Sequence, residues 1–321
     1  MRCRSFSQNL LQLTYSLVDT RIVGTFLGED ALAAVGATTT LSNLIIGFLQ
    51  GLSGGFAIIT AQKFGAKDYK DVKKIICHVT TYRNRNCVFF TIFGLLFLQP
   101  ILKMLNVPAN LLETAKSYIF IIIAGLVVTY LYDACAAALR SLGDSVTPLV
   151  ILAISVILNI IGDLFFVVIL KSGVKGAAIA TVLAQSIAFI VCWIYMIKRY
   201  ELLRLGREDF KNPSSAMMKN MLSAGLSMGF MSSLVNIGSL TLQTAINKLG
   251  RDYIVAQTAA RKLTEMFMLM FGVFGNTMAT YCGQNLGAGK IDRIKRGIWL
   301  SILIHLYLVY ICYYCKLYDW R

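Results

Sequence analysis

The sequence has little charge, few acids and none of the motifs that mark an enzyme. Only 15% of its 321 residues are charged, and 16 Asp and Glu stand against 31 Lys and Arg. The eight cysteines are scattered and give no disulfide framework. No His/Glu metal motif or Ser/His constellation is present, and no phosphate loop follows a strand, which argues against an enzyme and against a nucleotide-driven pump. We therefore expect no catalysis and no cofactor.

Long hydrophobic runs fill most of the chain. Hydrophobic residues make up 57% of it, in repeated runs of roughly 20 or more residues, the length of a transmembrane helix. Only helices and closed barrels satisfy backbone polar groups in lipid, so the sequence predicts an all-α, polytopic transmembrane helical bundle. About nine spans are expected, at residues 8–27, 33–61, 87–105, 117–138, 148–170, 175–197, 217–247, 254–281 and 297–315.

The net charge is +15, and the basic residues behind it are concentrated in every second loop. Basic residues collect after the second, sixth and eighth spans, at 63–74, 198–211 and 290–296, and Arg140 follows the fourth. This distribution is typical of the orientation rule for membrane insertion and not of nucleic-acid binding. We expect these loops and the N-terminus to be cytoplasmic. The first residues lack the cleavage site of a signal peptide.

An internal repeat relates the two ends of the chain. At one constant offset, "GEDALAAVGA" (28–37) aligns with "GRDYIVAQTA" (250–259), and "AQKFGAK" (61–67) aligns with "GQNLGAG" (283–289). Spans one and two therefore correspond to spans seven and eight, and the even number of spans between them gives both copies one orientation. The sequence predicts two parallel six-helix repeats. The expected parts are an N-terminal lobe (1–197), a cytoplasmic linker between lobes (198–216) and a partial C-terminal lobe (217–321).

The second repeat is expected to be incomplete, because the chain ends after its third span. The tail "YICYYCKLYDWR" does not end as a clean helix, and "TTYRNRNC" (80–87) places Arg83 and Arg85 where the third span should begin. We expect a truncated chain.

The stretch "ILNIIGDLFF" (157–166) carries an amide and an acid inside nearly unbroken hydrocarbon. A carboxylate there costs several kcal/mol and survives mainly where it faces a cavity, pairs or moves an ion. At about 1.5 Å of rise per residue, Asp19 and Asp163 lie roughly 12–13 Å below the external loops. Thr181 lies at a similar depth, and Asn159 lies one turn deeper than Asp163 on the same face.

These four side chains are predicted to form one site. Two carboxylates, an amide oxygen and a hydroxyl suit a bare monovalent cation such as Na⁺, with Asp19, Asn159 and Asp163 as its ligands. They also suit a proton, because burial beside a like charge makes a carboxyl easier to protonate. A purely structural role, in which each acid only fixes helix packing, stays open.

Three further charged residues are candidates for a secondary or substrate role. Asp133 stands two turns before Arg140 and can reach toward water. Glu265 lies near the middle of the eighth span with Arg261 one turn away on the same face, which favours a structural pair.

The chain resembles the multidrug and toxic compound extrusion transporters, especially their bacterial DinF-like branch. The resemblance rests on motifs along most of the chain: "LVDTRIVGTFLGEDALAAVG" (17–36), "AQKFGAKD" (61–68), "LRSLGDSVTPL" (139–149), "LNIIGD" (158–163), "GVKGAAIATVLAQ" (173–185), "TAARKLTE" (258–265) and "GQNLGAGK" (283–290). It implies two parallel six-helix lobes that export organic cations and other amphipathic compounds against inward Na⁺ or H⁺. It also implies that the coupling pattern of the N-terminal lobe falls on Asp19, Asn159, Asp163 and Thr181.

We therefore expect a secondary antiporter in the bacterial cytoplasmic membrane, acting as a monomer on small amphipathic or cationic molecules. Two alternatives stay open. One is a flippase of the same superfamily that moves lipid-linked sugars, and the other is an inactive fragment that only inserts.

Overall fold

The computed structural model describes residue 18 and residues 21–104, 109–200, 215–247, 271–272 and 274–318. Within these ranges all regular elements are helices, which confirms the all-α prediction. Ten helical segments carry labels: α2 (Glu29–Gly65), α3 (Tyr69–Leu96), α4 (Leu98–Met104), α5 (Ala109–Ala124), α6 (Leu126–Ser141), α7 (Val146–Asp163), the π-helix η1 (Leu164–Ile169), α8 (Gly173–Arg199), α9 (Ser215–Asn247) and α11 (Ile291–Tyr318). Residues 21–27 and 274–287 are also helical.

Four helical segments are long and apolar enough to cross a bilayer: Ala31–Gly65, Val146–Ile169, Gly173–Arg199 and Ser215–Ser239. The bent pair Leu111–Ala124 and Leu126–Ser141 adds a fifth if it counts as one span. The predicted first and eighth spans lie mostly outside the described residues, so the expected number of nine stays a prediction.

Two predicted spans differ from the helices observed. The expected span over 117–138 is bent by 44° at Gly125, between α5 and α6. A Cβ at Gly125 would overlap Val182 of α8, so a glycine is needed for this close approach. The third expected span, 87–105, falls within a longer helical stretch, because α3 is already helical from Tyr69 and ends at Leu96, and α4 continues from Leu98.

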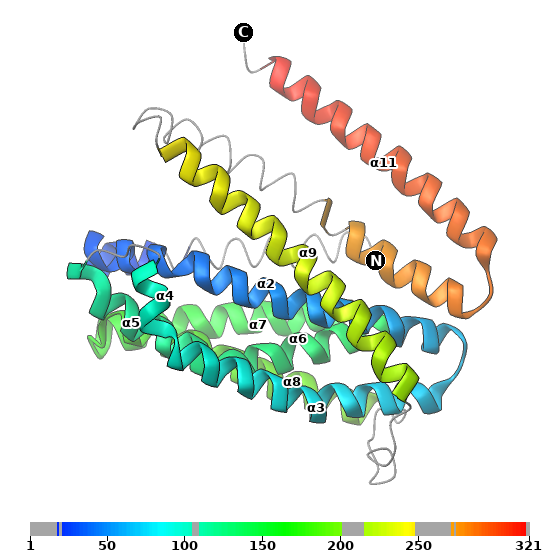
Figure 1. Cartoon of the computed structure of the whole chain (residues 1–321), viewed down its shortest axis with the longest axis horizontal. Helices are drawn as coiled ribbons and strands as arrows, with labels where there is room; N and C mark the ends of the chain where they lie inside the picture. Colours follow the sequence, from blue (N-terminus) through cyan, green and yellow to red (C-terminus); the bar gives the residue numbers. More distant parts are fainter. Residues whose placement is uncertain are drawn as a thin grey trace.

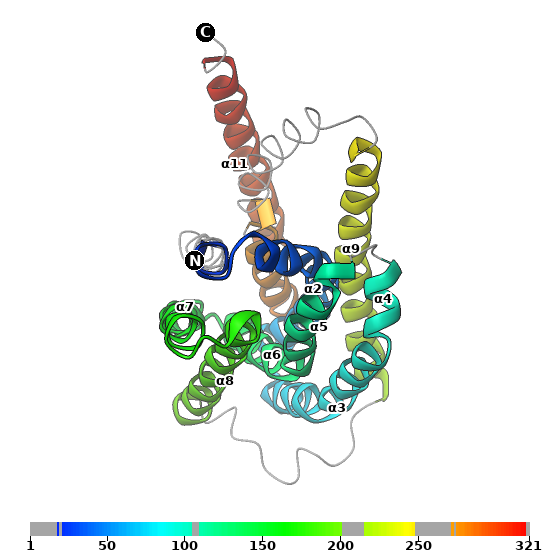
Figure 2. The same ribbon diagram turned by 90° about the vertical axis from the view of Figure 1, so that its left-hand side faces the viewer.

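Six helices form a bundle that α9 and α11 extend. Figures 1 and 2 show α2, α3 and α5 to α8 together, with α9 crossing α2 and α11 running away from the bundle. One apolar core joins α2, α3, α5 and α6 with Met217 and Met221 of α9. A second joins α3, α6, α7 and α8, and a third joins helix 21–27 with α2, α7 and α8.

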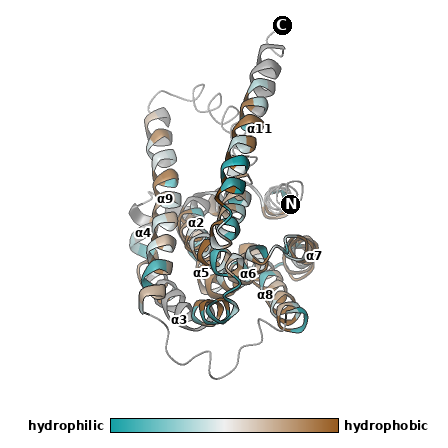
Figure 3. Cartoon of the chain, turned by 90° about the vertical axis from the view of Figure 1, so that its right-hand side faces the viewer, coloured by the Kyte–Doolittle hydropathy of each residue, from teal (hydrophilic) through white to brown (hydrophobic). Residues whose placement is uncertain are grey.

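The outer surface of the helices is apolar, as lipid contact requires. Large hydrophobic side chains are exposed along α7, α8, α9 and α11, among them Ile161, Leu234 and Leu303. Figure 3 shows this hydrophobic colour on the long helices and hydrophilic residues at one end of α8, α9 and α11. The ends of α8 and α11 carry basic residues of the loops that we predict to be cytoplasmic, such as Arg199 and Arg293.

The two copies of the internal repeat fold into the same turn. The first turn joins Gly65 of α2 to Tyr69 of α3, and the second joins Gly287 to Ile291 of α11 at the same offset. Three backbone hydrogen bonds recur: Ala66, Lys67 and Asp68 donate to carbonyls of 62–64 at 3.0 Å, and residues 288–290 donate to carbonyls of 284–286 at 2.9–3.0 Å.

The division into two lobes stays a prediction. The linker expected over 198–216 also stays a prediction; α8 runs to Arg199 and α9 begins at Ser215. Residues 201–214 lie outside the described part of the chain.

Side chains also hold the first turn. The Lys63 ammonium lies 2.6 Å from Asp71 Oδ2 and 3.1 Å from Asp68 Oδ2. The hydrogen bond from Lys63 lowers the pKa of Asp68. Asp68 Oδ1 in turn accepts from the backbone N–H of Asp71, which lies in the first turn of α3.

We expect Lys67→Gly to stabilise the protein. Lys67 has a left-handed φ of 59°, and the equivalent residue of the second turn is Gly289, with φ 69°. Because this conformation strains a residue with a Cβ, its removal should raise stability by about 1 kcal/mol. Thermal unfolding in detergent measures the effect. Lys73→Gly, inside α3, is the control and should lower stability by about 1 kcal/mol; a lower unfolding temperature for Lys67→Gly would contradict this account.

Candidate cation-coupling site

α7 and α8 form an antiparallel helix pair that carries the site. Asn159 and Asp163 lie one turn apart on α7 and are 1% and 0% exposed. They are polar residues in a segment whose other side chains are mostly apolar. The chain turns back at Leu170–Ser172, and α8 then brings Thr181 opposite them. Small residues allow this approach: a Cβ at Gly162 would lie 3.0 Å from Ala180 Cβ, and one at Gly176 would lie 3.0 Å from Phe166 Cβ.

The Asn159 amide links the acid to the hydroxyl. In the orientation that suits all of its neighbours, its nitrogen donates to Asp163 Oδ2 at 3.0 Å. Its oxygen then accepts from the backbone N–H of Thr181 at 3.1 Å and lies 3.3 Å from Thr181 Oγ1. Thr181 Oγ1 also donates to the carbonyl of Ala177 at 3.0 Å. The buried Asn159 and Asp163 and the half-buried Thr181 therefore form one polar group between two apolar helices.

The structure brings together three of the four predicted site residues. Asp19 lies outside the described residues, so the second carboxylate is not placed. The same holds for Glu265 and Arg261. Asp133 lies on α6, where it is hydrogen-bonded to Gln50 of α2 and interacts electrostatically with Arg140.

A π-helical segment begins directly after Asp163. η1 covers Leu164–Ile169, and its wider turn is closed by the N–H of Leu170, which donates to the carbonyl of Phe165. Such segments are rare and occur frequently at functional sites. Nothing in the sequence predicted η1, because "LFFVVI" contains no proline or glycine that could indicate it.

The donor set fits a monovalent cation or a proton. Carboxylate, amide and hydroxyl oxygens are hard ligands, which Na⁺ prefers over the nitrogen and sulfur ligands of transition metals. In the described part of the chain, no three His, Cys, Asp or Glu side chains lie together as a metal group. We treat such an ion as a transported species and not as a resident cofactor.

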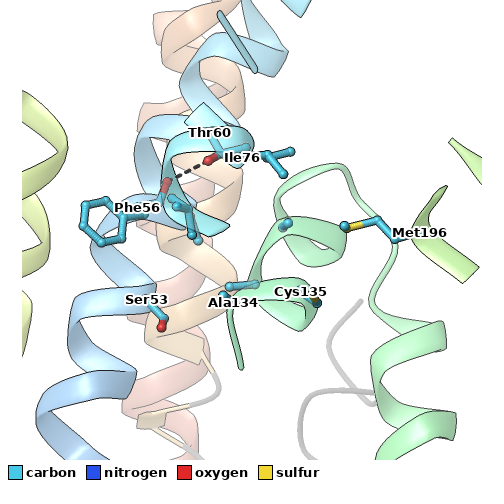
Figure 4. A pocket seen from close by; sticks show the side chains of 11 residues that line it. Ser53, Phe56, Thr60, Ile76, Ala134, Cys135 and Met196 are labelled. Atoms are coloured by element: carbon cyan, nitrogen blue, oxygen red, sulfur yellow. Dashed lines mark hydrogen bonds between the residues drawn. The ribbon is translucent and has the colours of Figure 1, made fainter. Parts of the chain in front are cut away.

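A separate cavity in the bundle is too small and too apolar to be a drug site. It lies between α2, α3, α6 and α8, has a volume of about 20 Å³, and is lined mainly by apolar side chains such as Phe56, Ile76 and Met196 (Figure 4). Its hydroxyl groups, on Ser53 and Thr60, donate to carbonyls of their own helix at 3.0 and 2.8 Å. This volume holds about one water molecule.

Sequence comparisons connect the chain with one group of transporters. Residues 5–165 match the MatE family. A probable multidrug resistance protein of Bacillus subtilis (strain 168), YoeA, is 28% identical over 95% of this chain and 68% of its own length. A second from that organism, YpnP, is 27% identical over 89% and 64%. An FAD transporter of Shewanella oneidensis is 22% identical over 93% and 67%.

Solved structures show the same fold. An outward-facing multidrug resistance MATE family transporter of the MOP superfamily superposes with a TM-score of 0.88 at 23% identity, over 95% of this chain and 67% of the other. MATE in a bent conformation gives 0.87, also at 23% identity, over 95% and 68%. This chain therefore spans about two thirds of the length of the proteins it matches.

Proposed function

Because the chain belongs to the MatE family of transporters, we propose that it exports small cationic or amphipathic molecules in exchange for Na⁺ or H⁺. The family consists of transporters and not of enzymes, and the apolar helices make this chain a multi-pass membrane protein. Curated relatives that bear the name of multidrug resistance or export proteins support the class of substrate.

The observation that carries the proposal is the buried Asp163. Its carboxylate lies fully inside an apolar helix pair, joined to Asn159 and next to Thr181. Such a group is costly in a bilayer unless its charge is balanced by a bound cation or removed by a proton. We propose that Asp163, with Asn159, Thr181 and the predicted Asp19, binds one of these and releases it during each cycle.

The driving force is of the right size. One elementary charge that moves down a potential of 100 mV releases about 2.3 kcal/mol. Typical coupling free energies between two sites are about 1–3 kcal/mol. Binding of one cation at the Asp163 site can therefore shift the protein between a state of high and a state of low drug affinity. The proposed location is the bacterial cytoplasmic membrane, with the N-terminus inside and the chain acting as a monomer.

Dye uptake by inverted membrane vesicles tests this function. With an imposed Na⁺ or H⁺ gradient, vesicles that carry this chain should accumulate a fluorescent cationic dye, and vesicles without it should not. The gradient that drives uptake identifies the coupling ion. Absence of uptake under both gradients, from protein that has inserted, would contradict drug antiport by this chain and would leave the lipid-linked sugar flippase or the inactive fragment.

A further inference from the structure

The two repeat turns touch each other through equivalent residues. A Cβ at Gly65 would overlap the carbonyl oxygen of Gln284, and a Cβ at Gly287 would overlap the carbonyl oxygen of Gln62. In the repeat, Gln62 corresponds to Gln284 and Gly65 to Gly287. The contact is therefore reciprocal: each glycine admits the backbone of the glutamine in the other copy. We call these four residues the turn contact.

A side-chain hydrogen bond extends the turn contact to a third helix. Gln284 Nε2 donates to the carbonyl oxygen of Ser141 at 2.7 Å. Ser141 is the last residue of α6, where carbonyl groups have no partner within the helix. One turn of the repeat thus binds the ends of both α2 and α6.

On the same side of the molecule, α2 also packs closely against α9 where the two helices cross. A Cβ at Gly55 would lie 2.5 Å from backbone atoms of Ala224 and Gly225, and one at Gly51 would lie 2.5 Å from the carbonyl oxygen of Met228. Farther along α9, Leu234, Val235 and Leu242 are more than half exposed. In Figure 1 the turns of both repeats lie at the right-hand end of α2, and α9 and α11 extend from there toward the upper left.

The coupling residues lie toward the opposite end of the bundle. Asp163 is eight residues from the α7–α8 hairpin at Lys171, which we predict to be external, or roughly 12 Å along the helix. Thr181 is 19 residues from Tyr200 at the other end of α8, or roughly 28 Å. The turn contact is therefore well separated from the site and lies at the end predicted to be cytoplasmic.

We propose that the turn contact, Gln62 and Gly65 against Gln284 and Gly287, is the latch that closes the cytoplasmic side of this transporter during its cycle. The latch rests on the proposed function, because only a transporter has to open and close this side. The observed structure is the closed state of the latch.

The chemistry of the turn contact suits a reversible latch. The ion pairs of this region, Lys63 with Asp68 and Asp71, lie within the first turn and do not cross the contact. What crosses it is backbone contact at glycines and the hydrogen bond to Ser141. When the latch opens, the carbonyl oxygen of Ser141 can bind water at the membrane surface, so the exchange costs little.

Distance measurements between spin labels test the latch without any transport assay. The labels are placed by Lys70→Cys and Asp292→Cys in a full chain whose eight natural cysteines have been replaced. These positions are exposed, and they are equivalent in the two repeats. We expect a fraction of the molecules to show the short distance between the two labels that corresponds to the closed state.

Two variants separate the latch from general packing. Gly287→Leu should abolish the short-distance population, because its side chain cannot fit against Gln62. Gln284→Ala adds no volume and removes only the bond to Ser141, so the ratio of closed to open should fall about fivefold, the usual net effect of one intramolecular hydrogen bond. Gly275→Leu lies on the same helix with open space around its Cβ and should leave the distances unchanged.

The outcomes distinguish the latch from the proposed function. Unchanged distances in Gln284→Ala and in a folded Gly287→Leu protein would overturn the latch, whatever the vesicles transport. If Gly287→Leu does not fold, Gln284→Ala alone decides. A shift to longer distances in a protein that exports no dye would support the latch and contradict drug antiport only.

Discussion

The Asp163→Asn variant should insert normally and lose all gradient-driven dye uptake. Asparagine keeps the shape of the side chain and its bond to Asn159, but it can neither bind a cation with a full charge nor take up a proton. Because Asp163 is completely buried between α7 and α8, bulk water cannot solvate a cation there in place of the lost carboxylate. Uptake by inverted vesicles should fall to the level of vesicles without the protein, and the amount of inserted protein should stay the same.

Asp292→Asn is the matched control. Asp292 lies in the first turn of α11 and is exposed, so the same chemical change there removes a charge in contact with water. Uptake by this variant should equal that of the unmodified chain. Normal uptake by Asp163→Asn would remove Asp163 from the coupling mechanism and would favour the structural role that the sequence left open.

The Gly55→Leu variant should lose much of its stability. A leucine there would push its side chain into the backbone of α9 at Ala224 and Gly225, where even a Cβ has no room. Overpacking of this kind costs about 3 kcal/mol or more, since backbone yields less than a side chain. The apparent unfolding temperature in detergent should fall by roughly 5–10 °C.

Gly36→Leu provides the comparison on the same helix. A Cβ at Gly36 would meet nothing within 4 Å, and the residue is exposed. Its unfolding temperature should therefore change little. Equal losses for both variants would show that leucine harms α2 itself and that the crossing with α9 is not the cause.

Most of the features predicted from the sequence followed from two patterns: the length of its hydrophobic runs and the spacing of polar residues within them. Runs of apolar residues indicated the helical bundle, and the four-residue spacing of Asn159 and Asp163 placed both on one face of α7. Depth then predicted Thr181 opposite them, and the structure has Thr181 beside Asn159. The role of these residues in coupling, and the part of Asp19, stay predictions.

The remaining features depend on contacts between helices, which composition does not record. "IIIAGLVV" (121–128) looks like the middle of one span, and the break at Gly125 arises where Val182 of α8 approaches it. "LFFVVI" could form an ordinary α-helix, yet it forms the π-helix η1 after Asp163. The repeat indicated that Gly65 and Gly287 are equivalent but not that each contacts the glutamine of the other copy.

The turn contact gives one polypeptide the geometry of a symmetric dimer. In an isologous interface, residue i of one subunit contacts residue j of the other, and j contacts i. Gly65 with Gln284 and Gln62 with Gly287 satisfy this relation within a single chain. Two separate copies of a single repeat could therefore associate through the same four residues, with a twofold axis between the turns. In one covalent chain the two repeats can differ in sequence, as they do at the equivalent turn positions Lys67 and Gly289.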